Sequence, residues 1–332
     1  MSEFQASKRH QIPAIHALDK PRGDSCAPRS TNHSSLPGSL GARVMLAEFL
    51  QFLFSGITVG ATYALAALGF TLIYNASNVI NFAQGEFIML GGMLAVFFTQ
   101  GGMPLPLALP LAILVPALVG VVVEKLAIEP VKGAESVTLI IITIGASLVI
   151  RGLIQVWLGK GTFSLPAFSG DVPLRILGAT LMPQSLWVLG VTAIVVVALW
   201  YFFNRTLQGK AMLATSFNRV AAELVGINTN WVLFLSFAMS AALGALGGIL
   251  VTPITLTSYD VGIMLGLKGF VAAVVGGLGN GLGAVVGGLL VGILEAMGAG
   301  YISSSYKDAI PFVLILFFMP RGLLGGKSTD RV

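Results

Sequence analysis

The chain has 332 residues, of which 55% are hydrophobic and 10% charged, with a formal net charge of +5. Soluble domains carry about 25% charged residues, so this composition excludes an ordinary soluble protein and favours one that lies in a lipid bilayer. The small positive charge indicates basic loops that orient membrane helices, and it excludes an extended surface for nucleic acid.

The residues of the chain do not support a metal site or a catalytic site. Cys26 is the single cysteine, and the three histidines, His10, His16 and His33, all precede residue 45. An internal disulfide, or a metal site built on cysteine or histidine, is therefore excluded from the apolar part of the chain. No set of nucleophile, base and acid can be assembled either. We expect no catalytic residue, no metal and no cofactor.

Residues 1–44 form a polar segment that differs from everything after it. They are rich in serine, proline, asparagine and basic residues, and they contain no apolar run. Such a segment cannot bury enough apolar surface to offset the entropy lost on ordering, so we expect a disordered extension. Met45 is an alternative start of translation, in which case the extension is not part of the protein.

From Leu46 onward, apolar runs alternate with short polar breaks. Since a spanning helix needs about 20 apolar residues, the sequence predicts an all-α, polytopic bundle with eight or nine membrane segments over residues 45–325, and a cytoplasmic tail at 326–332. The second, seventh and ninth runs are short, which is typical of broken, tilted or re-entrant elements. The predicted segments are 46–73, 86–101, 105–124, 137–157, 184–203, 231–251, 264–279, 282–298 and 309–320.

Basic residues orient this bundle. Arg205, Lys210 and Arg219 lie in one loop, 204–230, which the positive-inside rule places in the cytoplasm. Counting segments from this loop puts 158–183 outside and the C-terminal tail inside. The same count puts the N-terminus outside despite its basic residues, so either the early segments are miscounted or the rule does not hold there.

Glycine spacing predicts close helix packing. The pairs at 56/60, 244/248, 283/287 and 288/292 each place two glycines on one helix face, where another backbone can approach. A weak internal repetition is also present, because an apolar helix precedes an irregular polar stretch within 60–86 and again within 240–262. Repeats of this kind are typical of transporters with pseudo-symmetric halves.

The loop 204–230 contains the most specific pattern. The run AAELVGIN at 221–228 predicts a short helix that ends at Gly226, because glycine is favoured just past a helix end. A short helix between two membrane spans suits docking to a cytoplasmic partner. An ordinary amphipathic helix at the membrane surface is the alternative.

This run resembles the coupling-helix loop of ABC importer permeases. The stretches 60–86, 268–279 and 306–308 are in turn similar to those of the branched-chain amino acid permease family, and the resemblance extends over about residues 46–325. It implies that the permease contacts its ATPase through five residues of the loop, namely Ala221, Ala222, Glu223, Gly226 and Ile227.

The resemblance implies a non-catalytic permease subunit in the bacterial inner membrane. Its partners would be a second permease, identical or a paralogue, two ATP-binding subunits and an extracytoplasmic substrate-binding protein that delivers an amino acid, expected to be a branched-chain one. Two alternatives stay open. Related permeases carry urea or short amides, and an ion-coupled secondary transporter would need an ion site within the membrane.

Polar side chains inside apolar stretches are costly and by default indicate function. Glu86 follows Asn81 and Gln84, and this group either lines the transport pathway or satisfies the backbone of a broken helix. Glu295 can pair with Lys268 across adjacent spans, and we interpret that pair as structural. Glu86 and Glu295 are also the two acidic residues on which an ion site would depend.

Overall fold

The computed structural model describes residues 38–131, 134–170, 172–176, 178–318 and 323, and the chain divides into two compact units, 1–41 and 42–332. The features below belong to the second unit. Residues 1–37 of the expected extension, and the expected tail 326–332, lie outside the described residues. Residues 38–44, the last part of the expected extension, are helical.

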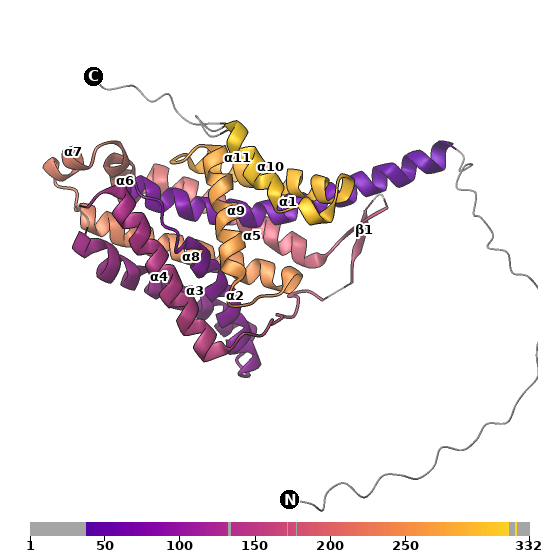
Figure 1. Ribbon diagram of the computed structural model, residues 1–332, viewed down its shortest axis with the longest axis horizontal. Coiled ribbons are helices and arrows are strands. Elements are labelled where there is room, and N and C mark those ends of the chain that lie inside the picture. The colour runs from indigo at the N-terminus through magenta and orange to yellow at the C-terminus, as the bar shows by residue number, and fades with distance from the viewer. Residues whose placement is uncertain (1–37, 132–133, 171, 177, 319–322, 324–332) are drawn as a thin grey trace, which may run out of the picture. The chain divides into compact units, whose positions relative to one another are not determined.

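Helices make up most of the described structure (Figure 1). Two short strands, β1 (Leu174–Ile176) and β2 (Ala179–Leu181), form an antiparallel hairpin. The helices are α1 (Gly38–Ser77), α2 (Gln84–Gln100), α3 (Leu105–Val123), α4 (Ser136–Leu158), α5 (Pro183–Arg205), α6 (Leu207–Phe217), α7 (Arg219–Leu224), α8 (Thr229–Thr255), α9 (Val261–Gly276), α10 (Gly281–Tyr301) and α11 (Ala309–Phe318). A π-helical turn and a 3-10 turn continue α3 from Glu124 to Val131, and another 3-10 turn spans Ser304–Tyr306.

The predicted all-α, polytopic architecture is confirmed. Six helices among the described residues are long and apolar enough to cross a membrane, namely α1, α3 with its continuation, α4, α5, α8 and α10. The runs predicted to be short correspond to α2, α9 and α11, which have 17, 16 and 10 residues. These nine helices together account for the predicted segments.

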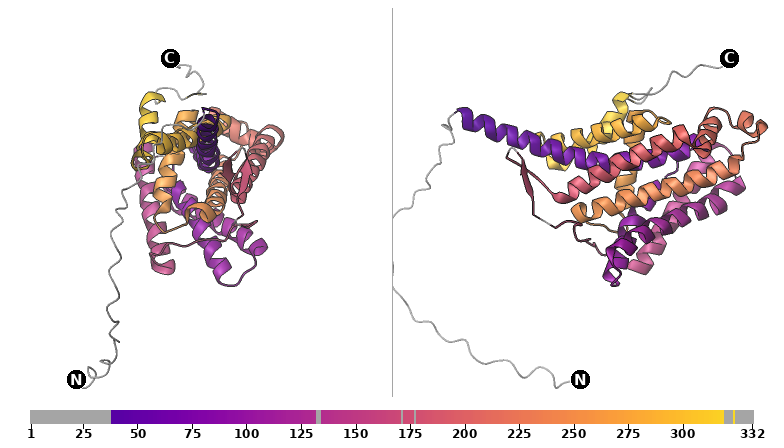
Figure 2. Two further views of the ribbon diagram at one scale, coloured as in Figure 1. Left: turned by 90° about the vertical axis from the view of Figure 1, so that its right-hand side faces the viewer. Right: turned by 180° about the vertical axis from the view of Figure 1, so that it is seen from behind.

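The helices α1, α5 and α8 lie side by side (Figure 2, right). Ala61 and Leu65 of α1 meet Val188 of α5 and Leu250 of α8 in one buried cluster. Because lipid tails are as apolar as these side chains, close van der Waals packing, rather than the hydrophobic effect, holds such helices together.

The shorter helices α2 and α9 cross over between the two halves of the chain. α2 follows α1 but packs against α8 and α3, whereas α9 follows α8 but packs against α10 and, through Gly269 and Ala66, against α1. In Figure 1, α9 runs across the direction of α1. Neither half can therefore form its own core without the other.

The two long helices that precede α2 and α9 end in the same way. Asn78 directly after α1 has φ 55°, and Leu256 directly after α8 has φ 66°. Both lie in the left-handed region, where a non-glycine residue is uncommon. The repetition seen in the sequence, at 60–86 and 240–262, coincides with these two units of a long helix, a turn and a short helix.

Glycines allow α1 and α10 to approach closely. A Cβ on Gly56 would lie 2.7 Å from the Cα of Ile293, and a Cβ on Gly60 would lie 2.8 Å from the Cα of Leu289. The predicted pair at 288/292 forms the other side of the same contact. The packing role predicted for these glycine pairs is confirmed at this interface.

The connection between α4 and α5 was predicted only as an external loop, and the β1–β2 hairpin within it was missed. Thr180 ties the hairpin to α1, because its backbone N–H and hydroxyl donate to Gln51 Oε1 at 2.7 and 3.0 Å. Phe163 exchanges two backbone hydrogen bonds of 2.8 Å with Thr257 beyond α8. These contacts cap one end of the bundle.

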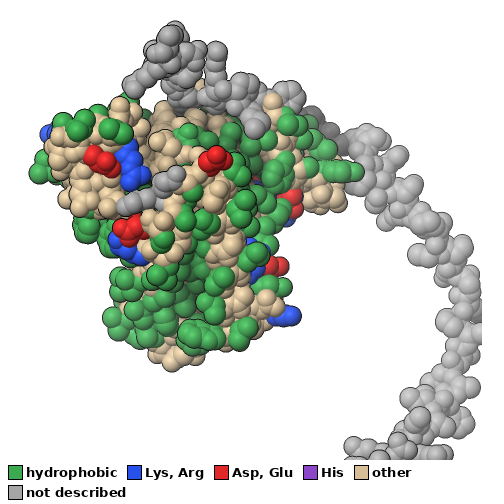
Figure 3. Space-filling model, turned by 60° about the vertical axis from the view of Figure 1, so that its left-hand side comes forward, with side chains coloured by type: hydrophobic (Ala, Val, Ile, Leu, Met, Phe, Trp, Pro, Cys, Tyr) green, Lys and Arg blue, Asp and Glu red, His purple; other side chains and the backbone are tan. Residues whose placement is uncertain are grey.

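The surface of the bundle suits a lipid environment. Figure 3 shows a face of hydrophobic and uncharged side chains on which the charged ones form small separate groups. Large hydrophobic side chains such as Val156 and Trp157 of α4 are both 82% exposed. Such exposure is costly in water, and lipid or a second membrane subunit would cover these side chains in the bilayer.

Candidate functional site

Polar caps shape the segment 204–230 into successive helices. Thr206, Asn218 and Asn228 each accept a backbone N–H in the first turn of α6, α7 and α8, at 3.0, 3.0 and 3.1 Å. Threonine and asparagine are favoured at this position because their side chains satisfy N–H groups that the helix leaves unpaired. The short helix predicted in this loop is α7. The prediction lacks α6, although Thr206 and Asn218 signal its two ends.

Gly226 occupies the position just past α7 that the sequence predicts for it. Its φ is +86°. Its N–H donates to Glu223 O at 3.0 Å, and the N–H of Ile227 donates to Ala222 O at 3.0 Å. This pair of bonds is the Schellman motif, which requires a left-handed residue and therefore favours glycine.

The five residues expected to contact an ATPase do not share one face. Ala222 is only 2% exposed, and Ile227 packs against the hydrophobic core. Glu223 accepts hydrogen bonds from Thr229, at 2.6 Å, and from Arg219, at 3.4 Å. Its own chain covers Ala222 in this structure, and the contact of these residues with an ATPase stays a prediction.

The segment exposes Ala221, Glu223 and Gly226 of the predicted set, and it also exposes large apolar side chains. Phe217, Val220, Leu224 and Val225 are 81%, 67%, 83% and 77% exposed, and together we call them the α7 apolar surface. An apolar group of this kind in the loop between two membrane helices marks a contact site for another protein or for the membrane. Phe217 and Val220 are not among the predicted residues, since neither lies in the resembling run.

The residues Asn81 and Gln84 are buried at the start of α2. Asn81 Oδ1 accepts the N–H of Ala83 at 3.0 Å and so shapes the turn that enters α2. Gln84 Nε2 donates to Ser240 O at 3.1 Å, and the hydroxyl of Ser240 lies 2.6 Å from Gln84 Oε1. These bonds fix α2 against α8. Asn81 and Gln84 are 1% and 0% exposed.

Glu86 forms an ion pair with Arg151 of α4. Its Oε1 also accepts the hydroxyl of Ser147 at 3.0 Å. Arg151 was missed by the sequence analysis, yet it is a lone charge inside the apolar run 137–157 and could have been found for that reason. Glu86 is 1% exposed, and its Oε2 finds no hydrogen-bond partner among the described residues.

A second charged group joins α9, α10 and the connection before α11. Lys268 Nζ donates to Glu295 Oε1 at 2.7 Å and to Asp308 Oδ1 at 2.6 Å. Tyr63 of α1 donates its hydroxyl to Glu295 Oε2 at 2.9 Å. The structure thus brings Lys268 and Glu295 together. The hydrogen bond from Lys268 lowers the pKa of the Asp308 carboxyl, which keeps it ionised.

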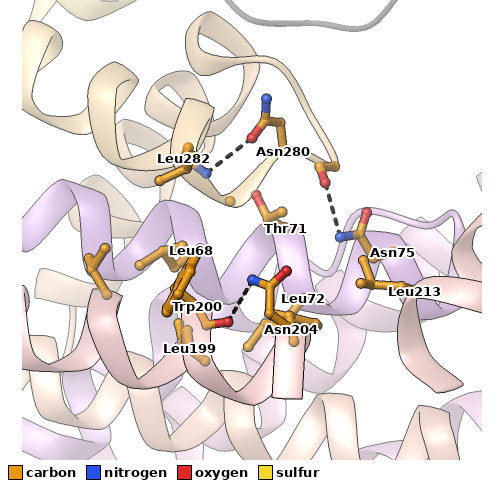
Figure 4. A pocket seen from close by; sticks show the side chains of 14 residues that line it. Leu68, Thr71, Leu72, Asn75, Leu199, Trp200, Asn204, Leu213, Asn280 and Leu282 are labelled. Carbon is orange, nitrogen blue, oxygen red and sulfur yellow. Dashed lines mark hydrogen bonds between the residues drawn. The ribbon is translucent and has the colours of Figure 1, made fainter. Parts of the chain in front are cut away.

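A cavity of about 480 Å³ opens between α1, α5, α6 and the turn that leads into α10 (Figure 4). Its walls are mostly aliphatic and aromatic. Asn75, Asn204 and Asn280 supply amides, and the buried Thr71 supplies a hydroxyl. Asn75 Nδ2 donates to Gly279 O at 3.0 Å, which connects the end of α1 to the α9–α10 turn. None of these residues is among those predicted from the sequence.

Comparison with known proteins identifies the family. A family described as "Branched-chain amino acid transport system / permease component" matches residues 52–319. The permease protein LivH of a high-affinity branched-chain amino acid transport system in Salmonella typhimurium is 32% identical over 307 residues, which cover 86% of this chain and 98% of LivH. LivH of Escherichia coli K12 is 33% identical over 304 residues, and BraD of Pseudomonas aeruginosa is 32% identical over 304 residues, both with the same coverage.

Permeases of this family are non-catalytic inner-membrane subunits of ABC importers, and they work with separate ATP-binding subunits and an extracytoplasmic binding protein. The match covers most of the described membrane helices, and the relatives match over nearly their whole length. The chain therefore belongs to the permease components of branched-chain amino acid transport systems.

Proposed function

We propose that this permease passes branched-chain amino acids into the cell. The observation that carries the proposal is the identity of 32–33% to permeases named for branched-chain amino acid transport, over 98% of their length. Uptake of leucine by the assembled importer in vesicles supplied with ATP tests the substrate, with urea and a short amide as competitors. Competition by urea, with no competition by isoleucine or valine, would overturn the assignment.

The assembly in this proposal has two permeases, identical or paralogous, two ATP-binding subunits and one binding protein. The α7 apolar surface is the proposed ATPase contact. Two of its exposed side chains, Val220 and Leu224, lie on α7, and Phe217 and Val225 lie on either side of that helix. Asn218 caps α7 at its start, and Gly226 turns the chain after its end. Because α7 packs against both α6 and α8, we propose that movement of a bound ATPase is passed to these two helices.

Leu224→Asp tests this contact without disturbing the permease, because the side chain is 83% exposed. Burying an unpaired charge in a protein interface costs several kcal/mol, so we expect the variant to insert normally but to lose its ATPase during purification. Val172→Asp is the matched control, since Val172 is 79% exposed in the α4–α5 connection. Normal ATPase retention and uptake in Leu224→Asp would remove the α7 apolar surface from the proposal.

For the α2 residues we propose a structural role rather than pathway lining. Gln84 joins α2 to α8, and Glu86 joins α2 to α4. Both side chains bond to neighbouring helices and are at most 1% exposed, although Glu86 Oε2 has no hydrogen-bond partner among the described residues. On this proposal Asn81, Gln84 and Glu86 position α2, and Lys268 with Glu295 positions α9 against α10.

A further inference from the structure

Asp308 differs from the charged side chains within the membrane helices because it is only partly covered. The side chains of Glu86 and Arg151 are 2% and 20% exposed, and those of Lys268 and Glu295 are 7% and 10% exposed. The side chain of Asp308, in the connection before α11, is 47% exposed. What can surround this carboxylate depends on how deep in the membrane it lies.

The contacts of Lys268 place Asp308 within the membrane. α10 has 21 residues, a length of about 31 Å at 1.5 Å per residue, which matches a hydrocarbon core of about 30 Å. Glu295 precedes Tyr301, the last residue of α10, by six residues, which is roughly 9 Å along the helix axis. Lys268 Nζ lies 2.7 Å from Glu295 Oε1 and 2.6 Å from Asp308 Oδ1, so the two carboxylates lie at a similar depth.

The direction of α10 fixes the side of the membrane. Its first residue, Gly281, lines the cavity that also contains Asn204 and Leu213, so α10 begins at the end of the bundle that carries the segment 204–230. Asp308 lies toward the opposite end. Because its basic residues predict that 204–230 is cytoplasmic, Asp308 belongs to the outer half of the membrane.

The residues before Asp308 form an exposed polar segment, 303–308. The hydroxyl of Ser303 accepts the N–H of Ser305 at 3.2 Å and so shapes the turn that begins the segment. Residues 304–307 are all exposed, and each carries a hydroxyl or an ammonium group. Charged groups at membrane depth face the protein interior or a water-filled cavity rather than lipid. This segment therefore indicates a water-filled space beside Asp308.

The charges around Lys268 favour a cationic group in that space. Lys268 is shared by two carboxylates, so this group of three side chains has one negative charge in excess. Glu295 is occupied within the group, because its Oε1 accepts Lys268 and its Oε2 accepts the hydroxyl of Tyr63 at 2.9 Å. Asp308 is the carboxylate that is open to the outside. Lys307 beside it is basic, so the segment presents both signs of charge, as the ammonium and carboxylate of an amino acid require.

We propose, resting on the proposed transport of amino acids, that the polar segment 303–308 lines the outer part of the transport pathway. Asp308 accepts a hydrogen bond from the ammonium group of the passing amino acid, and Lys268 holds the Asp308 carboxylate in position. A pathway must bind its cargo well enough for entry and weakly enough for release. A carboxylate that is partly exposed and shared with Lys268 meets both requirements.

Labelling of introduced cysteines tests whether the segment faces water. Cys26, the single cysteine, is replaced by serine, and Tyr306→Cys or Asp308→Cys is introduced into the complete importer in right-side-out membrane vesicles. A cationic, membrane-impermeant methanethiosulfonate then labels thiols that face water. Tyr306→Cys keeps Asp308 intact, so the test does not depend on whether a substitution at position 308 is tolerated.

The matched controls are Leu153→Cys and Val149→Cys, on the apolar surface of α4, where the side chains are 58% and 63% exposed. Leu153 precedes the last residue of α4 by five residues, roughly 8 Å, which matches the depth of Glu295. We expect Tyr306→Cys and Asp308→Cys to be labelled severalfold faster than both controls. Equally slow labelling at all four positions would show that lipid or another subunit covers the segment, and it would overturn the proposal.

Uptake by Asp308→Asn and Asp308→Glu tests the contact with the ammonium group. With ATP and leucine-loaded binding protein, we expect Asp308→Asn to lower leucine uptake severalfold, while ATP hydrolysis and the unfolding midpoint stay close to those of the wild type. Asp308→Glu restores the charge and should recover most of the uptake. A merely structural role beside Lys268 would lower the midpoint together with uptake. Normal uptake in Asp308→Asn would exclude the ammonium contact.

Failure of the proposed function would give a different result. A wild-type importer that takes up urea and not leucine would overturn the proposed substrate. Labelling at positions 306 and 308 needs no substrate, so it decides separately whether the polar segment lines the pathway.

Discussion

Lys268 of α9 and Glu295 of α10 form a buried ion pair, with Nζ 2.7 Å from Oε1 and side chains 7% and 10% exposed. Removing one partner of a buried pair costs about 3–5 kcal/mol, because the remaining charge is left uncompensated. We expect Lys268→Met to lower the midpoint of thermal unfolding in detergent strongly. Asp308→Asn should have a much smaller effect, because its side chain is 47% exposed and exposed pairs contribute about 0–1 kcal/mol. Equal effects would contradict this ranking.

The ion pair between Glu86 and Arg151 predicts a pattern of mutual rescue. Glu86→Gln leaves Arg151 without its partner, so we expect less folded protein in the membrane. Arg151→Gln should be similarly harmful. The double variant should recover part of the loss, since residues in contact have non-additive effects. Leucine uptake, normalised to folded protein, should then be close to normal in the double variant. Restored folding with abolished uptake would return Glu86 to the transport pathway.

Close packing predicts very different effects for two helix glycines. A Cβ on Gly248 of α8 would overlap the carbonyl oxygen of Ile88 in α2, whereas a Cβ on Gly145 of α4 meets no described atom within 4 Å. Gly248→Ala should separate α2 from α8 and reduce both thermal stability and the amount of protein in the membrane. Gly145→Ala should leave both unchanged or slightly improved, because alanine is the better helix former by up to about 1 kcal/mol. A harmless Gly248→Ala would show that the two helices are not in contact.

The backbone at Leu256 predicts a stabilising substitution. Its φ of 66° is unfavourable for a leucine, by roughly 1–2 kcal/mol, and its side chain is 48% exposed, so little packing is lost on truncation. Leu256→Gly should therefore raise the unfolding midpoint or leave it unchanged, despite the greater flexibility of glycine when unfolded. Leu256→Val should lower it. The opposite order of the two midpoints would contradict the left-handed conformation.

The sequence predicts the bundle well because membrane helices leave a strong local signal. Apolar runs and their lengths identify nine helices, α1 to α5 and α8 to α11. The spacing of Gly56 and Gly60 indicates close packing before any partner helix is known. Gly226 is predicted correctly for the same reason, since a helix end depends on its own few residues. The pair of Lys268 and Glu295 could be predicted because it joins consecutive helices.

Contacts between distant segments could not be predicted in this way. The partner of Glu86 lies 65 residues away, and nothing near Glu86 in the sequence points to Arg151. The burial of Ala222 depends on how α7 folds back against its own chain, which the run AAELVGIN does not encode. The cavity is similar: Leu68, Val196 and Leu213 come from three helices, and only their packing leaves a space between them.

The crossover of α2 and α9 has a consequence for how the chain is made. Gln84 enters the membrane early in synthesis, but Ser240, to which it bonds, is translated 156 residues later. Until α8 is synthesised, the amide of Gln84 in α2 lies in the membrane without its final partner. Glu86 likewise lacks its partner Arg151 until α4 is synthesised. A chain truncated after α7 would thus lack the partner of Gln84 and leave its amide unpaired within the membrane.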